Sequence, residues 1–272
     1  MELGLALSGG GFRATAYHLG VLARLAEENR LEEVTFLSTV SGGSLCAGLV
    51  FALNGFQWPS SQVYRERIAP EARRRMTSYD FQVGLLRRVL RAPWRILESK
   101  AGALAFLLQT QWGVTIPLRD LPTRPRWMIN ATCYETGKNW RFERFRMGDY
   151  IYGYTNDTDF PVSQAMAASA GFPGLIGPLV LPARGRKWFK YREDGRDVQV
   201  AVNAPPDART EPITPAFPSV HLWDGGVYDN HGLEGLVHPI RGWKNEIEFL
   251  IVSDAAGRPK PGSRTRAARL PA

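Results

Sequence analysis

The sequence predicts an α/β fold whose sheet begins with parallel strands. Two observations near the N-terminus support this prediction. Residues 3–7 and 34–37 are apolar, β-prone runs, and each leads through a glycine-rich turn into a helical pattern, over 14–28 and 44–53 respectively. Alternation of strand and helix is typical of a parallel sheet with helices packed against it.

Residues 54–112 lack strand character, and we expect them to form a helical insertion. Within it, apolar residues recur at helical spacing from Leu85 to Leu97 with arginines between them, and Pro93 should break or kink that helix. Ten basic residues lie between 62 and 101 against four acidic ones. The basic residues are Arg65, Arg67, Arg73, Arg74, Arg75, Arg87, Arg88, Arg91, Arg95 and Lys100.

The composition of this insertion fits two different structural interpretations. Its apolar and basic side chains fit a helix that lies on an anionic membrane, with the arginines at the level of the lipid head groups. They also fit a lid whose apolar face packs on the domain while the arginines face water. The net charge of +8 favours anionic surfaces in general. Because zinc-finger spacing, an aromatic RNA-binding signature and basic-region heptads are all lacking, we expect no nucleic acid partner.

The later elements follow in order along the chain. Two strands, at 127–134 and 140–146, are joined by a turn at 135–138. Residues 161–174 carry small side chains that suit a helix packed tightly on the sheet and ended by glycine and proline. The remaining segments are a polar surface excursion at 183–218, strands at 221–223 and 248–253, and a basic tail at 258–272 that we expect to be disordered.

Composition limits the class of protein. At 272 residues with 44% hydrophobic residues, the chain can bury a substantial core, and no apolar run approaches the roughly 18 residues of a membrane span. Cys46 and Cys133 are too few for a disulfide framework and lack a metal-ligand spacing, so we expect buried thiols and no metal. Together with the lack of a signal-peptide pattern, this favours a cytoplasmic location.

The turn at 38–44 contains the candidate nucleophile, Ser41. A β-prone run precedes it, Gly42 and Gly43 follow it, and a helix begins directly behind, which is the setting of an exposed serine on a strained strand-to-helix turn. The match to G-x-S-x-G is partial, because Thr39 occupies the position of the first glycine. Ser44 is the competing serine, one turn into the helix. An ordinary glycine turn is the alternative interpretation.

The turn at 8–13 contains Gly9, Gly10 and Gly11, which leave successive N–H groups free at a helix N-terminus and so suit an oxyanion. The spacing of Gly9, Gly11 and Ala14 also fits a dinucleotide-binding fingerprint. That interpretation needs an acidic residue at the end of the second strand, where the chain instead has serine and threonine. Since no P-loop lysine follows the glycines either, we expect no cofactor.

A serine nucleophile needs a base. His18 lies inside the first predicted helix as a packing residue, and His238 follows Asp224 too closely to leave room for a strand and helix between them. Asp224 is the better candidate, because it stands at a strand end with Gly225 and Gly226 behind it. Taken alone, D-G-G is more often a plain turn.

In combination, these motifs resemble the patatin-like phospholipases from about residue 3 to residue 254. Four blocks match in order: the G-G-G-x-R loop at 9–13, the serine turn at 40–44, the alanine, serine and proline block at 165–178, which contains Ser169, and D-G-G at 224–226. The resemblance implies a three-layer α/β/α sandwich with a central, mostly parallel sheet. It also implies one domain over residues 1–257, with the helical insertion inside it.

The resemblance further implies a Ser–Asp dyad that needs no histidine and no cofactor. Ser41 would attack an acyl ester and Asp224 would take its proton. Gly9, Gly10 and Gly11, with Gly42, would hold the oxyanion, and Arg13 would orient the loop or meet a lipid phosphate. The expected activity is hydrolysis of fatty-acyl esters such as phospholipids, at a peripheral membrane surface. The alternative is a catalytically silent module that binds acidic lipid or a protein partner.

Overall fold

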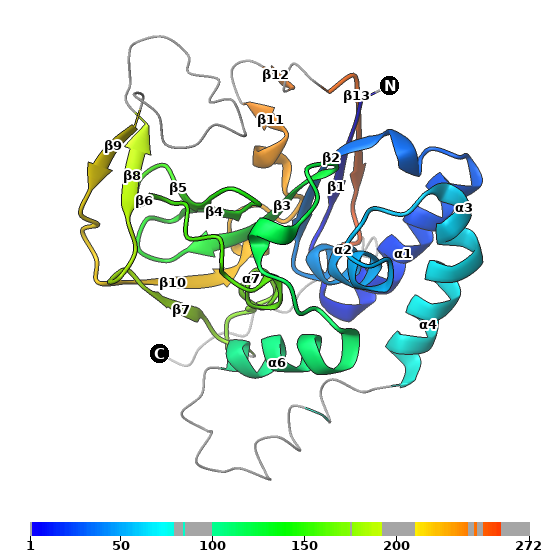
Figure 1. Cartoon of the computed structure of the whole chain (residues 1–272), viewed down its shortest axis with the longest axis horizontal. Helices are drawn as coiled ribbons and strands as arrows, with labels where there is room; N and C mark the ends of the chain where they lie inside the picture. The colour runs from blue at the N-terminus through cyan, green and yellow to red at the C-terminus, as the bar shows by residue number, and fades with distance from the viewer. Residues whose placement is uncertain are drawn as a thin grey trace, which may run out of the picture.

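The computed structural model of the chain describes residues 2–78, 84, 100–174, 176–191, 210–238, 242–243 and 247–256. Figure 1 shows one sheet running through the molecule, with the helices gathered beside its N-terminal strands. The apolar and basic stripe expected at 85–98 and the tail expected at 258–272 lie outside the described residues.

The first half of the fold matches the predicted alternation of strand and helix. Its elements are β1 (Leu3–Leu7), α1 (Gly11–Glu27), β2 (Val34–Val40), α2 (Gly42–Leu53), β3 (Arg126–Cys133) and β13 (Phe249–Ser253). The four strands pair in the order β13-β1-β2-β3, all parallel. Strands β1 and β2 are buried along nearly their whole length, which explains their apolar sequences.

The second half of the sheet is antiparallel, so the sheet is mixed rather than mostly parallel. The turn at residues 134–137 joins β3 to its neighbour, and so short a connection permits only antiparallel pairing. The strands are β4 (Lys138–Phe142), β5 (Met147–Asp149), β6 (Gly153–Thr155), β7 (Leu179–Pro182), β8 (Trp188–Tyr191), β9 (Thr210–Ile213) and β10 (Ser219–Asp224). The predicted α/β class is confirmed. The prediction of a long surface segment over residues 183–218 is wrong where β8 and β9 lie.

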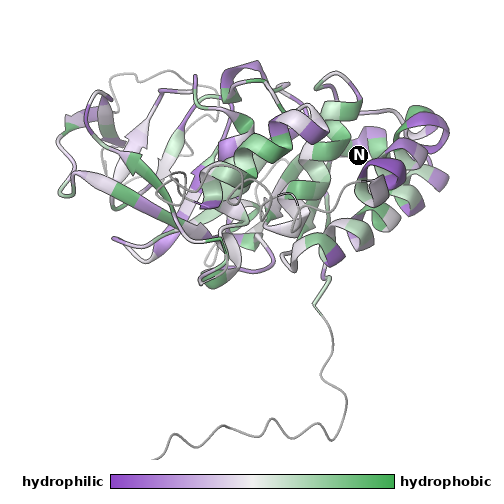
Figure 2. Ribbon diagram, turned by 90° about the horizontal axis from the view of Figure 1, so that it is seen from below, coloured by the Kyte–Doolittle hydropathy of each residue, from purple (hydrophilic) through white to green (hydrophobic). Residues whose placement is uncertain are grey.

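Helices cover the parallel strands and fill the described parts of the predicted insertion. They are α3 (Ser61–Val63), the π-helical turn η2 (Tyr64–Ile68), α4 (Ala69–Ser78), α6 (Lys100–Trp112) and α7 (Val162–Ser169). Many of the helical ribbons in Figure 2 alternate between hydrophobic and hydrophilic residues, as expected for helices with one buried side. Over the part of the chain that the structure describes, no helix is both long and apolar enough to cross a bilayer.

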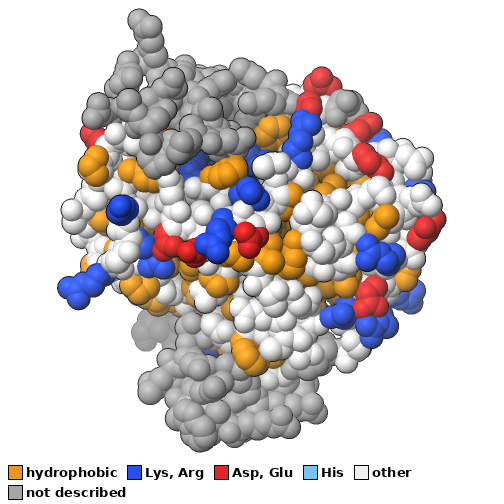
Figure 3. Space-filling view, in the orientation of Figure 1, with side chains coloured by type: hydrophobic (Ala, Val, Ile, Leu, Met, Phe, Trp, Pro, Cys, Tyr) orange, Lys and Arg blue, Asp and Glu red, His pale blue; other side chains and the backbone are white. Residues whose placement is uncertain are grey.

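Short elements complete the fold. They are the 3₁₀ turns η1 (Leu31–Glu33), η4 (Leu118–Asp120), η5 (Gly225–Val227) and η6 (Leu233–Gly235), and the strand pair β11 (Val237–His238) and β12 (Gly242–Trp243). Most buried apolar side chains form one cluster that joins the helices to the sheet, and Cys46 and Cys133 are free thiols within it. A smaller cluster contains Ala6, Met128 and Leu236. On the face seen in Figure 3, basic and acidic side chains are interspersed.

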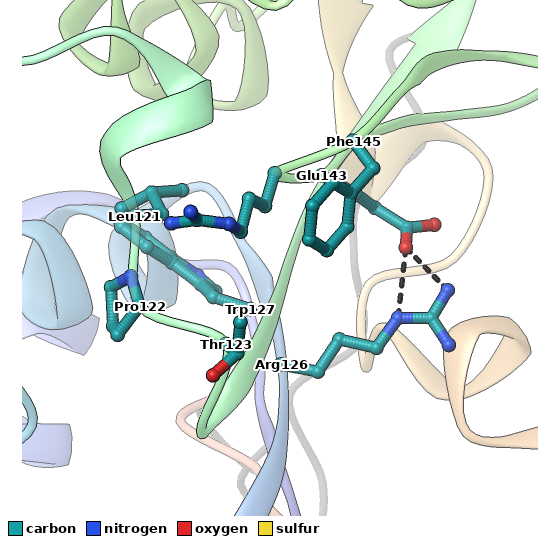
Figure 4. A pocket seen from close by; sticks show the side chains of 8 residues that line it. Leu121, Pro122, Thr123, Arg126, Trp127, Glu143 and Phe145 are labelled. Carbon is teal, nitrogen blue, oxygen red and sulfur yellow. Dashed lines mark hydrogen bonds and ion pairs between the residues drawn. The ribbon is translucent and has the colours of Figure 1, made fainter. Parts of the chain in front are cut away.

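A buried ion pair ties the start of β3 to the end of β4. Arg126 donates two hydrogen bonds to Glu143, one of them from Nε at 2.9 Å, at the edge of a small pocket (Figure 4). The side chains of Arg126 and Glu143 are only 11% and 5% exposed. Burial lowers the pKa of Arg126, Glu143 raises it, and the neighbouring Arg146 and Arg141 lower it again. Glu143 therefore offsets repulsion among these arginines.

Replacement of Glu143 by glutamine should destabilise the fold by about 3–5 kcal/mol, because removal of one partner leaves buried charge uncompensated. Chemical denaturation would measure the loss. The control is Glu27→Gln, since Glu27 pairs with Arg24 at an exposed site where an ion pair contributes at most about 1 kcal/mol. Equal small effects of the two substitutions would contradict a stabilising role for the buried pair.

Candidate active site

The register of β3 places the ends of two other strands side by side. β2 runs parallel to β3 and ends with Val40 opposite Asn130. β10 runs antiparallel to β3 and ends with Asp224 opposite Ala131. Because Asn130 and Ala131 are consecutive, β2 and β10 arrive at the same point from opposite directions. Ser41, which follows Val40, therefore lies beside Asp224.

Ser41 sits on a strained turn between β2 and α2. Its backbone has φ 49° and ψ −114°, a positive φ that costs a non-glycine residue roughly 1–3 kcal/mol and persists only where the surroundings enforce it. The Ser41 N–H donates to Ser169 Oγ at 2.9 Å, and the residue is 5% exposed. A Cβ on Gly42 would lie 2.2 Å from the carbonyl oxygen of Gly11, so Gly42 permits backbone contact between the two turns.

Asp224 is held from several directions at the end of β10. Its N–H donates to the carbonyl of Gly171 at 3.1 Å, and its own carbonyl accepts from Thr132 Oγ1 at 2.8 Å. Its carboxylate accepts the Gly226 N–H at 2.8 Å, and the Ser41 side chain lies close to it. Burial raises the pKa of Asp224, and the Gly226 N–H and the Ser41 hydroxyl partly counteract that effect. The arrangement is a buried serine–carboxylate pair.

The glycine loop before α1 lies against this pair. Gly10 and Gly11 have φ values of 135° and 64°, which glycine adopts without steric cost. Among the described residues, the N–H groups of Gly10, Gly11 and Gly42 have no hydrogen-bond partner. All three stand at helix N-termini, where such N–H groups and the helix dipole favour negative charge.

Gly9 differs from the other loop glycines, because its N–H already donates to the carbonyl of Asn230 at 3.0 Å. A Cβ on Gly9 would lie 2.4 Å from Asn230 Oδ1 and 3.3 Å from Ser41 Cβ. Gly9 therefore allows Asn230 and Ser41 to pack closely against the loop, while its N–H is already bound to Asn230. The sequence analysis missed Asn230, which follows the D-G-G turn and joins it to the glycine loop. An asparagine six residues beyond Asp224 carries no signal that distinguishes it from a turn residue.

The described histidines have other partners. His18 is buried, with Nε2 2.9 Å from the carbonyl of Ser8 and Nδ1 2.9 Å from Ser253 Oγ. His221 pairs with Glu135 at 2.5 Å, and His231 lies 3.5 Å from Asp254. The His238 side chain lies outside the described residues.

The remaining candidates also have defined places. Ser44 is fully buried, and its hydroxyl is committed to hydrogen bonds with Thr39 and Ser169. Ser41 is also buried, rather than exposed as the turn motif predicts. Arg13 is exposed on the first turn of α1. Within the described ranges, no group of three histidine, cysteine, aspartate or glutamate side chains could hold a metal ion.

Comparison with known proteins relates the chain to one family. The family model of the patatin-like phospholipases matches residues 5–237. A patatin-like phospholipase domain-containing protein of Chaetomium globosum is 24% identical over 184 residues, which cover 67% of this chain and 19% of that protein. The chain thus spans about a fifth of this relative's length.

Among solved structures, human GIVD cytosolic phospholipase A2 superposes with a TM-score of 0.51 at 16% identity, covering 87% of this chain and 41% of that one. VipD from Legionella pneumophila gives a TM-score of 0.44 at 14% identity, covering 91% of this chain and 48% of that one. The match to the human enzyme supports the same α/β fold.

The contact between the two turns can be tested by adding a methyl group. Gly42→Ala should destabilise the protein by about 1–3 kcal/mol, because the new Cβ overpacks the site against Gly11 and Ala14. Gly20→Ala is the matched control, since this exposed helical glycine has nothing within 4 Å of an added Cβ and should gain about 0.5–1 kcal/mol. Urea unfolding would measure the stability of both variants. Equal stability would contradict the close contact between Gly42 and the Gly11 backbone.

Proposed function

The chain belongs to the patatin-like phospholipase family, and we propose that it is a lipid acyl hydrolase that uses Ser41 as nucleophile and Asp224 as base. The observation that carries the proposal is the approach of the Ser41 side chain to the buried Asp224 carboxylate, close enough to lower the pKa of that carboxylate. A serine hydroxyl becomes an effective nucleophile only when a neighbouring base takes its proton. Burial strengthens this base by raising its pKa.

The proposed reaction has two halves. In the first, Asp224 takes the Ser41 hydroxyl proton as Oγ attacks the acyl carbonyl, and collapse of the tetrahedral intermediate expels the alcohol with the proton from Asp224. In the second, Asp224 takes a proton from water, and the resulting hydroxide attacks the acyl-enzyme. The fatty acid leaves, and the proton returns to Ser41 Oγ.

We assign the oxyanion to the N–H groups of Gly10, Gly11 and Gly42. What supports the assignment is that these groups are uncommitted and stand at two helix N-termini beside Ser41. Gly9 would act by packing rather than by donation, because its N–H bonds Asn230. Arg13, exposed on the first turn of α1, would meet a head-group phosphate or orient the loop.

The proposed substrates are fatty-acyl esters such as phospholipids, met at a peripheral membrane surface. The net charge of +8 supports contact with anionic lipid. No metal or cofactor is required by the proposed steps, since the proton acceptor and the oxyanion donors all belong to the chain.

The dyad predicts that Ser41→Ala and Asp224→Asn each abolish most ester hydrolysis while the fold persists, because nucleophile and base act as one unit. Turnover of a p-nitrophenyl ester and stoichiometric labelling by a fluorophosphonate probe would measure this. His238→Ala serves as the control and should retain activity. If wild type neither hydrolyses esters nor takes the probe, the silent lipid- or partner-binding module is the better assignment.

The raised pKa of Asp224 predicts a pH dependence. Activity requires the carboxylate form, so kcat/KM should fall as pH decreases through the raised pKa. The acid limb should therefore lie at higher pH than the titration of an ordinary aspartate. Tryptophan fluorescence over the same pH range separates this loss from unfolding. An acid limb at the ordinary aspartate position would contradict a buried base.

A further inference from the structure

A continuous line of buried hydroxyl groups ends at the backbone N–H of Ser41. Ser169 Oγ on α7 accepts that N–H at 2.9 Å and lies 2.8 Å from Ser44 Oγ on α2. Ser44 Oγ in turn lies 2.8 Å from Thr39 Oγ1 on β2, which accepts the Trp127 Nε1–H at 2.9 Å. Ser169, Ser44 and Thr39 are all 0% exposed. We call these three residues the hydroxyl chain.

The hydroxyl groups of the chain can donate their hydrogens in only one direction, from Ser169 towards Thr39. Ser169 Oγ already accepts the Ser41 N–H, so its own hydrogen can be donated to Ser44, Ser44 can donate to Thr39, and Thr39 can donate to the Met128 carbonyl at 3.5 Å. In the opposite direction the Ser169 hydroxyl hydrogen would have no acceptor among the described residues. A polarised line of this kind is stronger than its separate bonds and fixes the groups at its end.

We propose that the hydroxyl chain positions the nucleophile, and that Ser169 is its terminal positioning residue. The positive φ of Ser41 is a conformation that the surroundings must enforce. Ser169 does so from an element 128 residues away in sequence, by holding the Ser41 N–H on the inner side of the turn. The inference rests on the proposed function, because the turn matters to turnover only if Ser41 Oγ attacks the substrate.

The same contacts explain the residue before the turn. Thr39 occupies the position where a G-x-S-x-G turn has glycine, and its hydroxyl joins Trp127 of β3 to Ser44 of α2. A glycine there would leave the Ser44 hydroxyl without its acceptor.

The hydroxyl chain also bears on which backbone N–H groups at this turn have partners and which one is available to a substrate. The Ser41 N–H belongs to Ser169 and the Gly43 N–H to the carbonyl of Ser8, which leaves the Gly42 N–H for an oxyanion.

The test compares two serines of the same helix. Ser169→Ala removes the acceptor of the Ser41 N–H, whereas Ser163→Ala removes a buried hydroxyl that accepts from Gln109 at 2.9 Å on the same α7. Ser169→Ala loses two buried hydrogen bonds and Ser163→Ala loses one, so both should lose thermal stability, Ser169→Ala the more. Only Ser169→Ala should lower kcat on a short p-nitrophenyl ester, by roughly 10²-fold with KM nearly unchanged, because a displacement of about 1 Å at the nucleophile suffices for such a loss.

A second pair of variants keeps the proposal testable if Ser169→Ala fails to fold. Thr39→Val replaces the hydroxyl by a methyl group of similar shape and should lower kcat below that of the wild type, while Thr39→Ser should keep the wild-type kcat; equal kcat in both would overturn the proposal. If Ser169→Ala folds, the loss in the double variant Ser169→Ala/Thr39→Val should be close to that of Ser169→Ala alone, since both changes interrupt one network. Additive losses would overturn the hydroxyl chain as a unit.

Hydrogen exchange at the Ser41 amide separates failure of this proposal from failure of the proposed function. The amide should exchange slowly in wild type and Ser163→Ala and faster in Ser169→Ala. If the wild type hydrolyses no ester but this exchange pattern holds, the hydroxyl chain stands and the hydrolase assignment fails. If Ser169→Ala and Ser163→Ala match in kcat and in Ser41 exchange, the proposal is overturned.

Discussion

The candidate site depends on β3, which pairs with two strands along one edge. β2 pairs with the first part of that edge, up to Asn130, and β10 pairs with the rest, from Ala131 onward. A strand that runs parallel and one that runs antiparallel must then end against each other. Asp224 stands at the end of β10 and Ser41 directly after the end of β2, so the two residues meet at this junction. A shift of either strand by one residue would turn its side chains to the opposite face and separate the pair.

Such a junction leaves no space for side chains between the turns, which is why glycines surround it. A Cβ on Gly225 would lie 2.5 Å from the Asn130 carbonyl oxygen, and one on Gly43 would lie 2.3 Å from that of Leu7. The sequence analysis identified these glycines and the first βαβα segment because both are local features. It did not predict the mixed sheet, since strand direction follows from long-range pairing. Ser41 and Asp224 were both candidates because glycines follow each of them at a strand end, and the family resemblance joined them as a dyad. The link from Ser169 to Ser41 has no local signal.

The placement of the histidines explains how a hydrolase could work here with a carboxylate as base. His18 spans from the Ser8 carbonyl to Ser253, so it fixes the glycine loop to the end of β13. Burial lowers the pKa of His18, which favours the neutral ring, whose Nε2–H can donate to the Ser8 carbonyl while Nδ1 accepts from the Ser253 hydroxyl. A residue so engaged is a structural support for the glycine loop. Asp224, by contrast, has the short side chain that a direct contact with Ser41 across the junction demands.

A buried carboxylate at this position has a thermodynamic consequence. Burial raises the folded-state pKa of Asp224 above its unfolded value, so between the two values the folded protein binds more protons than the unfolded chain. Stability contributed by the protonated form is then complete below the unfolded pKa and is lost as pH rises through the folded pKa. The proposed reaction needs the ionised form, which is the less stable one. The Gly226 N–H and the Ser41 hydroxyl limit that loss, and the Ser41 hydroxyl is also the group that the reaction deprotonates. The contact with Ser41 that favours the resting carboxylate is therefore the path along which the proton would move.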